Sequence, residues 1–160
     1  MPTTGQQLST TTGITTKTML QLATPATRQI QVISWGFSCA TPPAGAAGAT
    51  VELIETDVAA TVTAHVAAGV QPLVPGMPAS LLTLGASATG YTATAEGATT
   101  ASRVFDAQRV LGVTNLGINS VYSRDFMPDE RPIVAVSKFL RVRVGFGAAV
   151  DMLCFVVWDE

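Results

Sequence analysis

The chain has 160 residues, of which 48% are hydrophobic and 12% are charged, so it can form one core and is too apolar to be disordered. Its formal net charge is -2, from nine Lys/Arg and eleven Asp/Glu, and provides no positive field for nucleic acid or an anionic membrane surface. No apolar run approaches the roughly 20 residues that a spanning helix needs, and the first residues lack the pattern of a secretory signal. We therefore expect a single domain that binds neither nucleic acid nor membrane and is not exported.

The first 16 residues differ in composition from the rest of the chain. They contain Thr, Gln, Ser and Gly, with Leu8 and Ile14 as the only sizeable apolar side chains. Such a segment cannot bury enough apolar surface to become ordered on its own. We therefore predict a flexible or extended N-terminal arm at residues 1–16 and a single domain at residues 17–160.

Residues 28–38 show the clearest strand pattern, because apolar and polar side chains alternate along them. A period of two places Ile30 and Val32 on one face and Trp35 and Phe37 on the other. Since both faces carry apolar side chains, this strand is expected to be covered on both sides or to lie at a subunit contact.

Residues 58–69 are ambiguous, because three valines spaced four apart fit a helix that ends at Gly69 and also fit a strand. We predict one short helix here. Residues 70–80 contain three prolines and a glycine and are expected to form an irregular crossing. Turn residues separate the remaining predicted strands, which are 17–22, 50–57, 89–97, 101–111, 118–126, 133–146 with a break near Ser137, and 148–160.

Eight or nine short strands, Gly/Pro-rich connections and little helix predict an all-β fold. The favoured architecture is an antiparallel β-sandwich of the jelly-roll kind, because the chain lacks the Cys–Trp–Cys spacing of immunoglobulin domains. Cys39 and Cys154 have neither metal-ligand nor CxxC spacing and are expected to be free, buried thiols. No internal repeat is present, which excludes a propeller or a solenoid.

The titratable residues do not form a recognisable catalytic pattern. His65 is the only histidine, no GxSxG motif is present, and we expect a surface or loop histidine rather than a general base. Glu52 and Glu55 are three residues apart in a strand and are expected on opposite faces. Residues 123–132 carry both charge signs and are expected to form a solvated loop. Calcium-loop and phosphate-binding glycine motifs are missing, so we predict no catalytic residues, no metal and no cofactor.

Two surface features are expected from the later part of the chain. Arg141 and Arg143 are two apart on one strand and predict a small basic stripe on a solvated or interface face rather than an anion site. The connections 70–80 and 111–120 are themselves apolar, and strand 148–160 is apolar on both faces. Because so few charges would make a monomer poorly soluble, burial in an assembly is favoured over two well-covered sheet faces and an ordinary core.

Residues 17–38, residues 51–72, and residues 136–144 together with 154–160 resemble small virion structural proteins of tailed bacteriophages, particularly those of actinobacterial hosts. The likeness lies in the overall pattern of residue types and in the order of the segments over most of residues 17–160. It includes no catalytic motif. It implies a capsid decoration, or cement, protein that is built on a β-sandwich and is often a homotrimer. It also implies binding to the major capsid protein, a position on the capsid surface of the virion, and assembly in the host cytoplasm.

On this hypothesis the N-terminal arm adds backbone hydrogen bonds to the sheet edge of a neighbour and anchors itself through its two apolar side chains. Apolar residues beside charges in the loop at 123–132 are also typical of interfaces. The resulting interaction candidates are Leu8, Ile14, Phe126, Met127 and Arg131.

Two other functions remain open from the sequence. One is a phage tail, baseplate or receptor-binding component, since β-sandwiches also serve there. The other belongs to a different class and is a small carbohydrate-binding β-sandwich module. That module is less favoured, because aromatic residues make up 6% of the chain and Trp35 and Trp158 lie within apolar strands.

Overall fold

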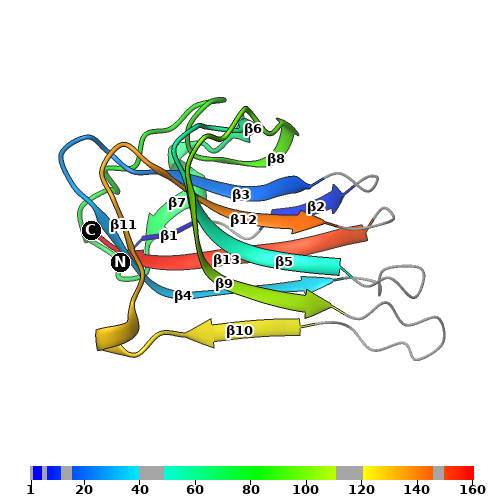
Figure 1. Cartoon of the computed structure of the whole chain (residues 1–160). Helices are drawn as coiled ribbons and strands as arrows, with labels where there is room; N and C mark the ends of the chain where they lie inside the picture. The colour runs from blue at the N-terminus through cyan, green and yellow to red at the C-terminus, as the bar shows by residue number, and fades with distance from the viewer. Residues whose placement is uncertain (1, 5–6, 12–15, 40–48, 111–120, 146–149) are drawn as a thin grey trace.

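The computed structural model describes residues 2–4, 7–11, 16–39, 49–110, 121–145 and 150–160. Figure 1 shows two antiparallel sheets that pack face to face as a β-sandwich, which confirms the predicted all-β class. The only helical elements in these ranges are the 3₁₀ turns Ala67–Gly69 and Pro128–Glu130. Over the same residues, no helix has the length and hydropathy needed to cross a membrane.

The described strands are divided between a seven-stranded and a six-stranded sheet. The first sheet has the order β10–β4–β13–β1–β7, with β11 beside β4 and β2 beside β13. The second sheet has the order β6–β8–β3–β12–β5–β9. The strands are β1 (Pro2–Thr4), β2 (Gln7–Thr11), β3 (Lys17–Ala23), β4 (Ile30–Cys39), β5 (Ala49–Thr56), β6 (Thr61–Ala64), β7 (Val70–Pro72), β8 (Gly90–Ala95), β9 (Ser102–Val110), β10 (Val121–Asp125), β11 (Ile133–Val134), β12 (Phe139–Gly145) and β13 (Val150–Asp159).

Eight of these strands have the connectivity of a jelly roll. In the first sheet β2, β13, β4 and β10 are neighbours in that order, and in the second sheet β3, β12, β5 and β9 are neighbours. Successive strands of this set alternate between the sheets, except that β5 pairs with β9 in the same sheet. Strands β6 and β8 extend the second sheet beyond β3. The predicted break near Ser137 is confirmed, since Ser137 has a φ of 55° between β11 and β12.

The core lies between the two sheets, and the prediction for the faces of β4 is wrong. Trp35 and Phe37 are buried in the same core cluster as Ile30 and Val32. The cause is a β-bulge: Trp158 pairs with Val32 and Val157 with Ser34, so Ile33 is an extra residue in β4. One inserted residue reverses the alternation along a strand, and every later side chain changes face.

The short helix predicted at residues 58–69 is also wrong. Residues 61–64 form β6, which pairs with β8, and only residues 67–69 form a 3₁₀ turn. The valine spacing was misleading, because Val62 is buried whereas Val66 is largely exposed, so the valines share no face. Val62 packs with two alanines in a small second cluster, and this tertiary contact outweighs the helical spacing.

Gly36 allows β4 to lie close to both of its neighbours. A Cβ atom at this position would be 2.5 Å from the carbonyl oxygen of Tyr122 and 2.6 Å from Cε1 of Phe155. We expect Gly36→Ala to lower the free energy of unfolding by about 1–3 kcal/mol, because the Tyr122 carbonyl belongs to paired backbone and cannot move away freely. The measurement is denaturant unfolding at equilibrium.

Gly145→Ala is the matched control, since its Cβ would meet no atom within 4 Å. We expect this change to stay within about 0.5 kcal/mol of the unsubstituted protein. Equal unfolding midpoints for the two variants would contradict the steric account of Gly36.

Candidate functional site

Among the described residues, the connection between β7 and β8 carries more exposed large apolar side chains than any other segment. Leu73, Val74, Met77 and Leu81, here called the apolar ledge, are between 47% and 59% exposed. Pro75 and Pro78 in this segment cannot donate to a sheet, and Gly76 has a φ of 86°, so the chain turns on the surface and does not add a strand. The predicted irregular crossing at residues 70–80 is therefore correct beyond the short strand β7.

The apolar ledge is fixed to the end of β13 by the side chain of Glu160. One carboxylate oxygen accepts a 2.7 Å hydrogen bond from the backbone N–H of Leu81. The other accepts hydrogen bonds from the Ser80 hydroxyl and, at 3.1 Å, from Nε1 of Trp158. A cavity of about 210 Å³ adjoins the ledge and is lined in part by Arg28 and Glu160. A surface held in this way loses little conformational entropy when a partner binds.

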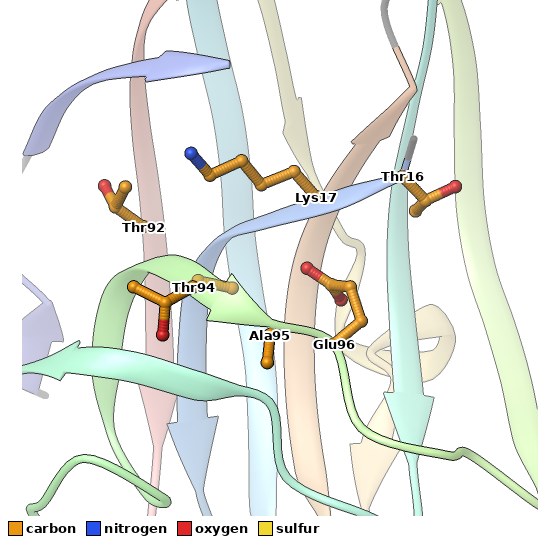
Figure 2. Close-up of a pocket in the computed structure, with 7 residues that line it drawn as sticks. Thr16, Lys17, Thr92, Thr94, Ala95 and Glu96 are labelled. Atoms are coloured by element: carbon orange, nitrogen blue, oxygen red, sulfur yellow. The ribbon is translucent and has the colours of Figure 1, made fainter. Parts of the chain in front are cut away.

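A polar pocket of about 470 Å³ lies where β3 begins and β8 ends (Figure 2). Two successive register shifts against β6 make Thr92 and Thr94 extra residues of β8, and Thr92 has a φ of 48°. Both threonines therefore line the pocket. Figure 2 shows the amine of Lys17 extended toward Thr92, while Glu96 lies at the other side. The residues lining the pocket are Thr16, Lys17, Thr92, Ala93, Thr94, Ala95 and Glu96.

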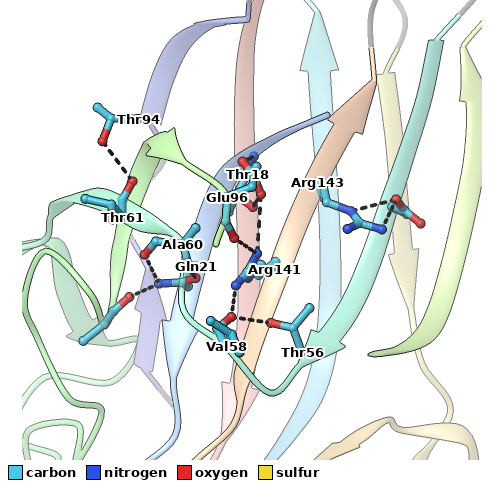
Figure 3. Close-up of polar contacts among 12 residues, drawn as sticks. Thr18, Gln21, Thr56, Val58, Ala60, Thr61, Thr94, Glu96, Arg141 and Arg143 are labelled. Carbon is cyan, nitrogen blue, oxygen red and sulfur yellow. Dashed lines mark hydrogen bonds and ion pairs between the residues drawn. The ribbon is translucent and has the colours of Figure 1, made fainter. Parts of the chain in front are cut away.

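Arg141 and Arg143 point to the same face of the second sheet, as predicted, but that face is not solvated at Arg141. The guanidinium of Arg141 is fully buried. It donates to the backbone carbonyl oxygens of Val58 and, at 3.1 Å, of Glu96, and it lies 3.4 Å from the Glu96 carboxylate (Figure 3). Thr18 donates to the same carboxylate through its backbone N–H and its hydroxyl. The expectation of a basic stripe is wrong because the chain around Val58 and Glu96 covers this face.

The carboxylates Glu52 and Glu55 also serve as ion-pair partners. Glu52 lies 2.8 Å from Arg143, and Glu55 lies 3.2 Å from Arg103. Both are partly exposed, and they lie on opposite faces of β5, as predicted. The pairing of β5 with β12 has no register shift, and it places Glu52 opposite Arg143 and Glu55 opposite the core residue Leu140.

A second polar cluster joins the two sheets at their β9 and β10 edges. Buried Asp106 of β9 accepts hydrogen bonds from Nε1 of Trp35 at 3.1 Å and from the Tyr122 hydroxyl at 2.7 Å. Gln108 donates to it at 3.2 Å, and Arg124 lies 3.4 Å away. Burial alone would raise the pKa of Asp106, but the hydrogen bonds, led by that of Tyr122, and the charge of Arg124 hold this pKa below its usual value. Because these contacts of Asp106 join β9 to residues of the other sheet, the cluster is called the inter-sheet clasp below.

His65 lies in the loop after β6, as predicted, but it is not at the surface. Only 7% of the residue is exposed, and its ring centroid is 5.0 Å from that of Tyr91. Burial lowers the pKa of the imidazole below its usual value. Sequence reasoning missed this burial, because the neighbours of His65 in the chain are small residues that say nothing of what packs on it.

Cys39 and Cys154 are free and buried, which confirms the prediction. Burial raises the pKa of Cys39 to about 11 and that of Cys154 to about 12. Because the thiolate is the reactive form, we expect neither thiol of the native protein to react with a thiol reagent at pH 8. Both should react once the protein is unfolded in denaturant, and mass spectrometry counts the adducts. Rapid labelling of the native protein would contradict this expectation.

The interaction candidates taken from the sequence have different environments. Leu8 lies in β2, opposite Leu153 in the register, and Ile14 lies outside the described residues. Phe126 is buried beneath the Arg124 guanidinium, so its expected exposure is wrong. Met127 is 68% exposed, and Arg131 is partly buried. No ledge residue was among these candidates, although the apolar character of 70–80 was the signal that could have found them.

Comparison with known proteins gives no relative for this chain: no protein-family model, no curated protein and no solved structure matches it. Within the described ranges, no group of three or more His, Cys, Asp and Glu side chains is placed to hold a metal ion. The apolar ledge and the polar pocket are therefore the features from which a function can be inferred.

Proposed function

We propose that this chain is a virion structural protein of the capsid decoration type, which binds the major capsid protein lattice and stabilises the head. The observation that carries the proposal is the apolar ledge, an exposed hydrophobic segment held in place by Glu160 in a chain with only 12% charged residues. Exposed apolar side chains beside polar ones are typical of protein interfaces. The resemblance of the sequence to phage virion proteins names the class of partner.

The mechanism is mechanical rather than chemical. Each copy buries its apolar ledge against the shell where capsid subunits meet, and so resists their separation. Because a shell offers many equivalent positions, modest contacts in each copy are sufficient when several copies are joined. The rigid attachment of the ledge to β13 transmits the load to the centre of the first sheet.

We also propose that the protein acts as a homotrimer that self-associates through the outer face of the first sheet. There, β13 carries the half-buried side chains of Leu153, Phe155 and Val157. Their partners in β4 are small residues, so these apolar side chains lie open on the face of the sheet. Light scattering should give three times the chain mass of 16.5 kDa. Leu153→Asp with Val157→Asp should yield a monomer, and a monomeric unsubstituted protein would contradict the trimer.

The decoration function is tested by sedimenting lysate from infected host cells in a density gradient and probing each fraction for the chain. We compare the unsubstituted protein with Leu73→Ser/Met77→Ser, which makes the ledge polar. Val104→Ser/Val136→Ser is the matched control, since these two valines are exposed elsewhere, at 52% and 43%. The unsubstituted protein and the control are expected in the heavy particle fractions, and the ledge variant in the light ones.

The two parts of the proposal fail in different ways. If the unsubstituted protein is found only in light fractions, it is not a decoration protein. If the ledge variant sediments with particles as well as the control does, the protein is a virion component but binds through another surface.

The polar pocket favours a second candidate, the carbohydrate-binding module. Threonine hydroxyls, Lys17 and Glu96 are side chains that hydrogen-bond to sugars, and a pocket of about 470 Å³ has the size of a small-molecule site. Glycan arrays probed with the protein, and with Thr94→Val as the control, test it. No signal on the array, or an equal signal with Thr94→Val, would contradict a carbohydrate-binding function of this pocket.

A further inference from the structure

His65 is packed directly against the turn that leads into the apolar ledge. Its backbone N–H donates a 3.1 Å hydrogen bond to the carbonyl oxygen of Thr89, which fixes it beside β8. On the other side, a Cβ added to Gly69 would lie 2.7 Å from Nδ1 of the imidazole, so the ring touches the 3₁₀ turn Ala67–Gly69. That turn is closed by a 2.8 Å hydrogen bond from the N–H of Gly69 to the carbonyl oxygen of Val66.

The surroundings of the ring suit a neutral imidazole and not a cation. Nε2 of His65 is buried and has no hydrogen-bond partner in the part of the chain that the structure describes. From β8, the phenol of Tyr91 faces the ring, and from the turn only the uncharged backbone of Gly69 does. No charged side chain contributes to the shift of the His65 pKa, which burial alone lowers. A protonated ring would therefore carry a buried charge without a counter-ion.

We propose that His65 is a pH-sensitive latch: the neutral ring holds the turn Ala67–Gly69 against β8, and protonation releases that turn. The turn is continuous with β7, and β7 leads directly into Leu73 and Val74. Release is confined to residues 66–69, because β7 pairs with β1 and Val70 belongs to the core cluster. The ledge itself stays held by Glu160. The latch concerns how this turn is held, and it does not depend on what the ledge binds.

The direction of the pH dependence follows from the lowered pKa. Above the ordinary histidine pKa of about 6.5, the ring is neutral in both the closed and the released segment, and closure is at its strongest. As the pH falls below this value, the released segment binds a proton that the closed one excludes. Closure weakens progressively until the pH reaches the pKa of the closed state.

Two measurements on the full chain test the latch. Because His65 is the only histidine, its imidazole NMR signals can be assigned without ambiguity, and we expect its titration midpoint to lie below 6.5. Hydrogen exchange of a peptide covering residues 64–70, which contains the Gly69 N–H that closes the turn, is then compared at pH 7 and pH 5 between the unsubstituted protein and His65→Phe. After correction for intrinsic rates, only the unsubstituted protein should show a several-fold increase at pH 5. Peptides from β12 and β13 should show no such difference.

The outcomes separate cleanly. An imidazole that titrates at or above 6.5 overturns the proposal and needs no variant. Equal pH dependence of exchange in the two proteins also overturns it, as does an increase that extends to β12 and β13, which would indicate general acid unfolding. If His65→Phe does not fold, His65→Gln replaces it, since glutamine is uncharged at both pH values. Failure of the ledge variant to lose capsid binding would leave these results unaffected.

Discussion

Asp106→Ala is expected to lower the free energy of unfolding by about 3 kcal/mol, because one buried and one partly buried donor would lose their acceptor at a cost of roughly 1–3 kcal/mol each. These donors are Nε1 of Trp35 and the hydroxyl of Tyr122, which belong to the first sheet while Asp106 belongs to the second. Equilibrium unfolding in denaturant, followed by tryptophan fluorescence, measures the loss.

Asp125→Ala is the matched control for this prediction. Asp125 is exposed at the end of β10, the strand that also carries Tyr122. Its removal is expected to change the free energy of unfolding by less than about 0.5 kcal/mol. A similar small effect for Asp106→Ala would show that the inter-sheet clasp contributes nothing to stability.

The same cluster predicts how stability depends on acid. Since the pKa of Asp106 is lower in the folded protein than its ordinary value of about 3.9, its contribution is complete above that value. The contribution is lost as the pH falls from there through the folded pKa, because the unfolded chain then binds a proton that the folded chain does not. Asp106→Asn should therefore flatten the acid side of the stability profile. A profile as steep as that of the unsubstituted protein would contradict this assignment.

The second large effect is expected for Arg141→Met, at about 3 kcal/mol, the lower end of the range for removing one partner of a buried ion pair. Methionine replaces much of the apolar stem, but the carbonyl oxygens of Val58 and Glu96 lose their donor. Figure 3 shows that these contacts hold the chain that crosses the second sheet. Denaturant unfolding measures the loss, and hydrogen exchange should be faster in a peptide covering residues 57–60.

Arg143→Met is the control, because it makes the same change two residues further along the same strand. The Arg143 guanidinium pairs with Glu52, and both side chains are partly exposed. Pairs of this kind contribute about 0–1 kcal/mol, so the two variants should differ by about 2 kcal/mol or more. Equal losses for Arg141→Met and Arg143→Met would contradict the structural role of the buried guanidinium.

The fold class could be predicted from the sequence because most strands alternate regularly and Gly or Pro separates them. The error in the strand faces lies at a single inserted residue, since Ile33 in β4 reverses the alternation. This position does not carry Gly, Pro or another residue that marks a bulge, so the period of two was continued past it. For this reason Trp35 was assigned to the wrong face.

The functional features could be predicted only where they depend on neighbours in the chain. The apolar character of residues 70–80 is visible in the sequence, and it indicated an interface. The hydrogen bond by which Glu160 holds this segment cannot be predicted from the sequence, because Ser80 and Glu160 are 80 residues apart. The Trp35–Asp106 bond joins residues 71 apart and depends on the bulge at Ile33. Burial of Arg141 and His65 likewise requires knowing which distant segment covers them.

The position of β13 determines when the domain can fold during protein synthesis. This strand follows all its partners in the sequence, yet it lies between β4 on one side and β1 and β2 on the other. Until residue 159 has left the ribosome, one edge of β4 has no partner, and the Trp35 side of the core lacks its cover. The nascent chain therefore completes its first sheet in one late step, and its open edge needs protection until then.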